Sequence, residues 1–147
     1  MELIIYGIYT FLAAYNAGNM MSLQIQHYGT YPFVGKDNFK SYMSANNKAA
    51  LIPAVIPGFL MLILSIVILF FRPAFMTTLE SMLSLGLNII AFISTFKWQR
   101  KLQSDMENTG YDETKIKLLI STNWIRTIAF LLLGTLTISI LIMAVPK

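Results

Sequence analysis

The chain has 147 residues, of which 56% are hydrophobic and only 12% are charged. Soluble globular domains carry roughly 25% charged residues, so this composition excludes an ordinary soluble domain and predicts a membrane protein. The net charge of +4 is small and its basic residues cluster at the expected membrane edges, which argues against a nucleic-acid partner, and the absence of cysteine excludes disulfides and thiolate chemistry.

Four charge-poor stretches predict an all-α fold, an integral membrane bundle of four transmembrane helices in a single domain over residues 1–147. The expected helices cover about 3–26, 49–71, 74–97 and 118–145, with longer loops at 27–48 and 98–117. The first helix is the least typical span, since amides follow its apolar start: Asn16, Asn19, Gln24 and Gln26. A cleaved signal peptide is an alternative there, although Glu2 replaces the expected positive region.

The second expected helix contains no charge between Lys48 and Arg72. Its small residues recur every four positions, as a ridge that lets another helix pack closely: Ala50, Ala54 and Gly58. Pro53 and Pro57 each remove a backbone donor, which predicts a kink. Two interpretations stay open, namely prolines tolerated near a helix start or a ligand cavity opened by the kink.

Polar residues of the third expected helix are spaced by threes and fours and share one face: Thr77, Glu80, Ser81, Ser84, Asn88 and Thr95. We expect this face to turn toward the interior and meet the amides of the first helix. At a rise of about 1.5 Å per residue, Asn16 and Asn88 both lie roughly 20 Å from the outer end and could bond to each other.

Glu80 is a candidate site residue because an acid inside a span is costly and often marks function. It lies about 9 Å from the outer end, level with Tyr9 and Thr10, and we expect a hydrogen bond to a neighbour such as Tyr9. The alternative is an acid close enough to the surface to stay hydrated, or one that serves only in packing.

The segment before the fourth helix contains helix-ending and helix-starting residues. Gly110 predicts the end of an extension of the third helix, and Asp112 can cap the next helix at about Glu113. The fourth helix should therefore begin outside the bilayer and project into it.

The fourth helix enters the membrane at Thr122-Asn123-Trp124-Ile125-Arg126-Thr127. Trp124 and Arg126 are typical of side chains that anchor at lipid headgroups. In the alternative, Asn123 and Arg126 face inward and hold an anionic or carbonyl-bearing ligand.

The lysines and arginines orient the spans, because cytoplasmic loops are enriched in them. Arg72 and Lys147 lie on one side, and all other basic residues lie on the other. We therefore expect the cell inner membrane, with both longer loops cytoplasmic and both termini outside. Aromatic residues should form a belt at the cytoplasmic interface: Tyr28, Tyr31, Tyr42, Trp98 and Trp124.

His27 is the only histidine and lies at the cytoplasmic end of the first helix. A metal site normally needs several converging His, Cys or carboxylate ligands, so we expect no metal and no cofactor. An interfacial or hydrogen-bonded histidine is the expected role.

Two stretches carry a resemblance to a known group. The first is Tyr31-Pro32-Phe33-Val34-Gly35 with Phe39 and Tyr42 after it, and the second is the string from Thr122 to Thr127. In order and spacing the chain resembles small four-helix bacterial membrane proteins of unknown function, a group similar to the anthrone-oxygenase-like proteins. The resemblance implies a four-helix membrane fold, and oxidoreductase chemistry with His27, Asn123 and Arg126 as conceivable site residues.

Two functions are open. We favour a noncatalytic membrane protein, either an accessory subunit of a membrane complex or a binder of a lipid or hydrophobic small molecule, because no catalytic constellation is visible. The alternative is a small membrane oxidoreductase acting on an aromatic or quinone-like substrate. The expected partners are the lipid bilayer and another membrane protein or a second copy. Candidate ligand-binding residues are Asn16, Asn19, His27, Glu80, Asn88, Asn123 and Arg126.

Overall fold

The computed structural model describes residues 2–145, and the regular structure in that part of the chain is helical throughout. The α-helices are α1 (Glu2–Ser22), α2 (Phe39–Ala49), α3 (Ile56–Phe70), α4 (Thr78–Ser94), α5 (Arg100–Thr109) and α6 (Glu113–Ala144). Three π-helical segments extend them, η1 (Leu23–His27), η4 (Leu51–Val55) and η5 (Thr95–Gln99). The all-α prediction is confirmed.

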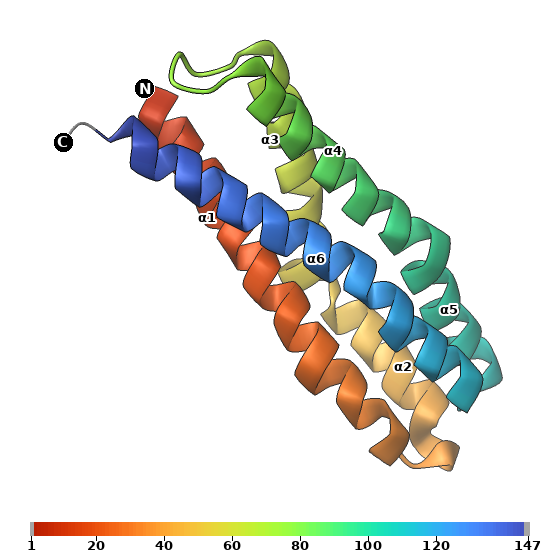
Figure 1. Ribbon diagram of the computed structural model, residues 1–147. Coiled ribbons are helices and arrows are strands. Elements are labelled where there is room, and N and C mark those ends of the chain that lie inside the picture. The colour runs from red at the N-terminus through yellow and green to blue at the C-terminus, as the bar shows by residue number, and fades with distance from the viewer. Residues whose placement is uncertain (1, 146–147) are drawn as a thin grey trace.

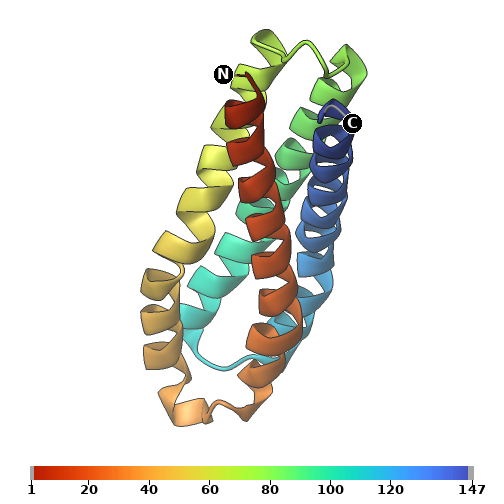
Figure 2. The ribbon, with the colours of Figure 1, turned by 90° about the vertical axis from the view of Figure 1, so that its left-hand side faces the viewer.

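The elements combine into long rods that lie side by side (Figures 1 and 2). α1 runs into η1, α2 into η4 and α3, and α4 into η5 and α5, while α6 is continuous. α1 and α4 each pack against α3 and α6 but not against each other, so they occupy diagonal positions. Both described chain ends lie at one end of the bundle, and α2 and α5 lie at the other, which we call the basic end (Figure 1).

The predicted longer loop at 27–48 is wrong in large part, because α2 forms helix there, whereas α5 in the connection at 98–117 is the expected extension of the third helix. Gly110 does end α5, with a φ of 93° that suits glycine, and Asp112 caps α6 by accepting from the Lys115 N–H at 3.0 Å. The prediction for this connection is thus confirmed. The basic end is built of packed helices that continue the bundle.

A second core explains why the basic end is helical. Its buried side chains are Tyr28, Tyr31, Phe39, Met43, Leu102, Met106, Ile116 and Leu119. Tyr28 and Tyr31 were expected in an interfacial belt, but both are almost fully buried here. They turn inward because α2 and α5 provide an apolar surface to cover, which loops would not have offered. Trp124, in contrast, is exposed as an interface residue should be.

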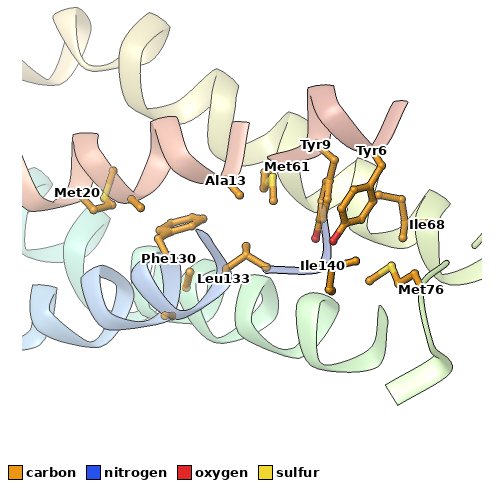
Figure 3. Close-up of a cluster of buried hydrophobic side chains, with 13 residues drawn as sticks. Tyr6, Tyr9, Ala13, Met20, Met61, Ile68, Met76, Phe130, Leu133 and Ile140 are labelled. Atoms are coloured by element: carbon orange, nitrogen blue, oxygen red, sulfur yellow. The ribbon is translucent and has the colours of Figure 1, made fainter. Parts of the chain in front are cut away.

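The main core fills the other half of the bundle (Figure 3), where side chains from α1, α3 and α6 interlock. α1 and α6 approach each other closely at Gly134, where an added Cβ would meet the Ala17 Cβ at 3.5 Å and the Ala13 carbonyl oxygen at 3.6 Å. The small-residue ridge expected at Ala50, Ala54 and Gly58 has another role, because these residues line cavities.

The outer surface is apolar over much of its length. Three helices are long and apolar enough to cross a membrane, namely Leu51–Phe70, Thr78–Thr109 and Glu113–Ala144. Large side chains such as Ile52, Phe70 and Ile142 stand at least two-thirds exposed. Exposed apolar surface on this scale is compatible with a lipid environment.

Candidate functional site

The three π-helical segments belong to three different rods and meet around one cavity. The lining of this cavity includes Leu23 and His27 from η1, Pro53 to Val55 from η4, and Thr95 and Gln99 from η5. A π-helical turn widens the helix and interrupts the regular i→i−4 pattern, and such turns are frequent at functional sites. Their convergence leaves a space of about 230 Å³, which we call the histidine cavity.

A second space of about 300 Å³ adjoins the first and is here named the phenylalanine cavity. Its lining includes Phe59 on α3, Phe92 and Phe96 on the rod of α4, and Phe130 on α6. The two cavities share part of their lining: Ala54, Val55, Thr95, Arg100 and Arg126. Arg126 therefore borders both cavities.

Arg126 is 7% exposed and lies on the inward face of α6. Its Nε donates to Asn123 Oδ1, and its Nη2 donates to the Tyr28 hydroxyl at 2.6 Å. Asn123 is fixed in turn, because its Nδ2 donates to Gln24 Oε1 at 2.6 Å. The inward alternative for Asn123 and Arg126 is therefore the orientation the structure shows.

No carboxylate balances the Arg126 charge within residues 2–145. The two ion pairs found there are Lys115–Asp112 and Lys117–Glu113, both on the surface of the basic end. Glu107 accepts from Asn47 Nδ2 at 2.8 Å and lines a separate cavity with Arg100. A buried cation without a counter-charge is costly, so the site favours an anionic or carbonyl oxygen next to the guanidinium.

His27 lines the cavity that is named after it and contacts Tyr31, whose hydroxyl lies 3.3 Å from His27 Nε2. Asn46 Nδ2 donates to the same hydroxyl at 3.0 Å. Burial lowers the pKa of His27 from its ordinary value of 6.5, with a smaller opposing effect from Asn46. The imidazole is therefore neutral at pH 7 and faces a cavity that also contains a guanidinium.

Asn19 and Asn16, both candidate site residues, hydrogen-bond to the helix that contains Pro53 and Pro57. Pro57 has no N–H to donate to the carbonyl of Pro53 four residues earlier. Two side chains donate to the Pro53 carbonyl instead: Asn19 through Nδ2 at 2.7 Å and Tyr15 through its hydroxyl at 3.0 Å. Asn16 Nδ2 donates to the Pro57 carbonyl at 3.4 Å. Asn19 and Tyr15 thus compensate for the missing N–H of Pro57, and Asn19 also lines the histidine cavity.

The expected bond between Asn16 and Asn88 is absent in the structure. Asn88 Nδ2 donates instead to Ser65 Oγ at 2.6 Å and to the Ser84 carbonyl at 3.1 Å. Since α1 and α4 are diagonal, Ser65 on the intervening α3 takes the role expected of Asn16. The polar face of α4 does point inward as predicted, and Asn88 lines the phenylalanine cavity.

Glu80 lies outside both cavities. α4 begins at Thr78 and not at residue 74, and Thr77 is its N-cap. Glu80 Oε2 accepts from the Thr77 N–H at 2.7 Å, and the Glu80 N–H donates back to Thr77 Oγ1 at 3.3 Å. This reciprocal capping box explains the acid, and the predicted bond to Tyr9 is wrong because Tyr9 pairs with Ser65 at 2.9 Å.

Several site residues were not identified from the sequence: Gln24, Tyr28, Asn46, Gln99, Arg100 and Gln103. A spacing of four was the available signal, because Gln99 and Gln103 continue the polar face of α4 beyond Thr95, and Tyr28 follows Gln24 by one turn. Gln103 Nε2 donates to the Tyr28 hydroxyl at 3.2 Å, and Gln99 Oε1 is buried without a partner.

Within residues 2–145 there is no group of three His, Asp or Glu side chains that could hold a metal ion. No family model, curated protein or solved structure matches the chain. The resemblance to the anthrone-oxygenase-like group thus stays a prediction.

Proposed function

We propose that the chain is an integral membrane protein that crosses the bilayer four times. Three long apolar helices support this directly. A crossing by the first rod is supported by the placement of its side chains. Its amides turn toward α3 and α6, while Ile4, Ile8 and Phe11 are exposed on the outer side. Chain ends on one side of the bundle suit an even number of crossings (Figure 2).

The basic end lies in the cytoplasm in this proposal, with both termini outside an inner membrane. Its lysines and arginines are Lys36, Lys40, Lys48, Lys97, Arg100, Lys101, Lys115 and Lys117. Arg72, in contrast, lies in the turn at the opposite end. This asymmetry follows the rule that positive loops stay in the cytoplasm.

The function we propose is binding of a hydrophobic small molecule or lipid by the two cavities. The observation that carries it is the Arg126 side chain, which is buried without a carboxylate partner and lines both cavities. Membrane-embedded charges are rare because they are costly, and they commonly mark ligand or ion sites. The aromatic lining beside Arg126 provides the apolar surface that such a ligand needs.

A native mass spectrum of the protein, purified from its own membrane in a mild neutral detergent, tests this function. We expect a retained small molecule on the wild-type chain, and its loss from Arg126→Gln. The matched control is Arg72→Gln, which alters an exposed arginine that bonds only Thr78 and should keep the molecule. A bare chain in both the wild type and the control would refute binding, and a second protein in fixed stoichiometry would instead identify an accessory subunit.

A second candidate is a small membrane oxidoreductase acting on an aromatic or quinone-like substrate. It is favoured by the neutral His27 imidazole, which faces the same cavity as Arg126 and could accept a proton from a phenolic substrate. An absorbance spectrum of the purified protein that shows bound quinone would support this candidate. A copurified molecule without such a chromophore would favour simple binding.

A further inference from the structure

We infer that the ligand is an amphiphile with an anionic head and a single apolar chain, its head at Arg126 and its chain in the phenylalanine cavity. The inference rests on the proposed binding function and adds the chemical class of the ligand. Three independent features of the site support it: the free donors, the shape of the adjoining cavity and the placement of the acids.

The donors around the head position are only partly used. Arg126 Nε donates to Asn123, and Nη2 donates one hydrogen bond to Tyr28. No described residue accepts a hydrogen bond from Nη1. The Tyr28 hydroxyl accepts from both Arg126 and Gln103, so its own proton is free to be donated. Two adjacent donors without acceptors suit the oxygens of a carboxylate or a phosphate.

The chain position follows from the aromatic side chains beyond Arg126. Phe92 contacts Phe59 edge to face, with ring centroids 5.5 Å apart, and Phe96 in a tilted arrangement, with ring centroids 4.6 Å apart. Phe59 and Phe96 are also about half exposed on the outer surface, so the cavity they line reaches from Arg126 toward the expected lipid. A volume of about 300 Å³ is at the lower end of ligand pockets, which favours one chain over two.

The arrangement of acids also favours an anion. The seven Asp and Glu side chains lie away from the Arg126 guanidinium, at the bundle ends or on α5 and the start of α6. Asp112 and Glu113 pair with lysines, and Glu107 accepts from the Asn47 amide. Arg100, exposed at the rim of both cavities, adds a second positive charge. An anionic head would therefore meet attraction from Arg126, which pairs with no described carboxylate, and from Arg100, which also lines the separate cavity that contains Glu107.

Binding of three probes by the full chain in neutral detergent, measured by native mass spectrometry, tests the ligand class. We expect dodecanoate to bind one to one, 1-dodecanol at least tenfold more weakly, and inorganic phosphate not at all. Arg126→Gln should remove the preference for dodecanoate over dodecanol, and Tyr28→Phe should reduce dodecanoate affinity several-fold. Arg72→Gln should bind as wild type, and circular dichroism and thermal unfolding confirm that each variant is folded.

The outcomes separate this inference from the proposed function. Equal binding of dodecanol and dodecanoate, or an unchanged preference in Arg126→Gln, would overturn the anionic head while leaving a hydrophobic-molecule binder. Binding of phosphatidylglycerol but not dodecanoate would overturn the single chain. If no amphiphile binds and none copurifies, the proposed function itself fails. Val55→Trp, which places a bulky ring in the lining that the two cavities share, should weaken dodecanoate binding if the chain lies against that lining.

Discussion

Arg126 on α6 and Tyr28 at the end of the first rod are 98 positions apart in the sequence, yet Nη2 of the arginine donates to the tyrosine hydroxyl at 2.6 Å. The bond joins the first and last rods at the level where the π-helical segments meet. It also holds the guanidinium inside the bundle, away from the lipid headgroups. A side chain that could have anchored at the interface is thereby turned into the polar centre of two cavities.

Membrane topology can be read by cysteine labelling, because the chain has no native cysteine. Lys40→Cys at the basic end and Ala74→Cys in the opposite turn both replace exposed residues. On intact cells, a membrane-impermeant maleimide should label Ala74→Cys only, and Lys40→Cys should react only after the membrane is opened. The reverse pattern would invert the topology, and labelling of both sites on intact cells would refute a crossing by the rod of α2, η4 and α3 and with it the proposal of four crossings.

A double-mutant cycle tests the role of Asn19 as a partner for the proline-freed carbonyl. Asn19→Ala should lower the free energy of unfolding by about 1 kcal/mol, because the Pro53 carbonyl loses a donor. Pro57→Ala restores a backbone N–H four residues after Pro53, so the loss from Asn19→Ala should shrink to less than half in that background. Unfolding in a denaturing detergent measures both.

Ser139→Ala is the control for this cycle, since its hydroxyl is exposed and bonds only within α6. It should change the free energy of unfolding little. An Asn19→Ala loss of equal size with and without Pro57 would contradict the proposed compensation and would point to a ligand role for Asn19 in the histidine cavity.

Substitutions in the capping box should separate stability from binding. Thr77→Ala removes the N-cap of α4 and should cost about 1 kcal/mol of unfolding free energy, while Glu80→Gln keeps an acceptor oxygen and should cost less. Neither change should alter the amount of copurified ligand, in contrast to Arg126→Gln. If Glu80→Gln removed the ligand without loss of stability, the acid would have a functional role after all.

The stability of the wild type should fall as the pH is lowered through about 6.5, the ordinary pKa of histidine. Burial lowers the pKa of His27, so below pH 6.5 the unfolded chain binds a proton that the folded chain resists, and protonation favours unfolding. The difference in melting temperature between wild type and His27→Gln isolates this effect from other titrating groups. A difference that does not depend on pH between 5 and 8 would contradict a buried neutral imidazole.

Local features of the fold were predictable because they depend on neighbours in the sequence. Gly110 and Asp112 determine the break between α5 and α6 through backbone conformation and capping alone. The spacing of polar residues on α4 likewise indicates its inward face without knowledge of what lies opposite. The inward orientation of Asn123 and Arg126 was one of two open interpretations, since a spacing pattern does not tell lipid headgroups from a protein interior.

Relations between rods were not predictable in the same way. Depth in the membrane placed Asn16 level with Asn88, but equal depth does not make two helices neighbours, and α1 and α4 are diagonal. Ser65, a lone hydroxyl within an apolar helix, became the partner of Asn88. The second core was missed for a related reason: α2 is short and polar, and only its packing against α5, over the core of the basic end, reveals why it is helical.

Photo-crosslinking with a dodecanoate that carries a diazirine near its chain end tests the central claim most directly. If Arg126 holds the head of an amphiphile, adducts on the wild-type chain should map to peptides containing Phe59, Phe92 or Phe96, and Arg126→Gln should lose them while Arg72→Gln keeps them. Adducts spread over the exposed outer faces of the helices, with the same yield in Arg126→Gln, would contradict the account.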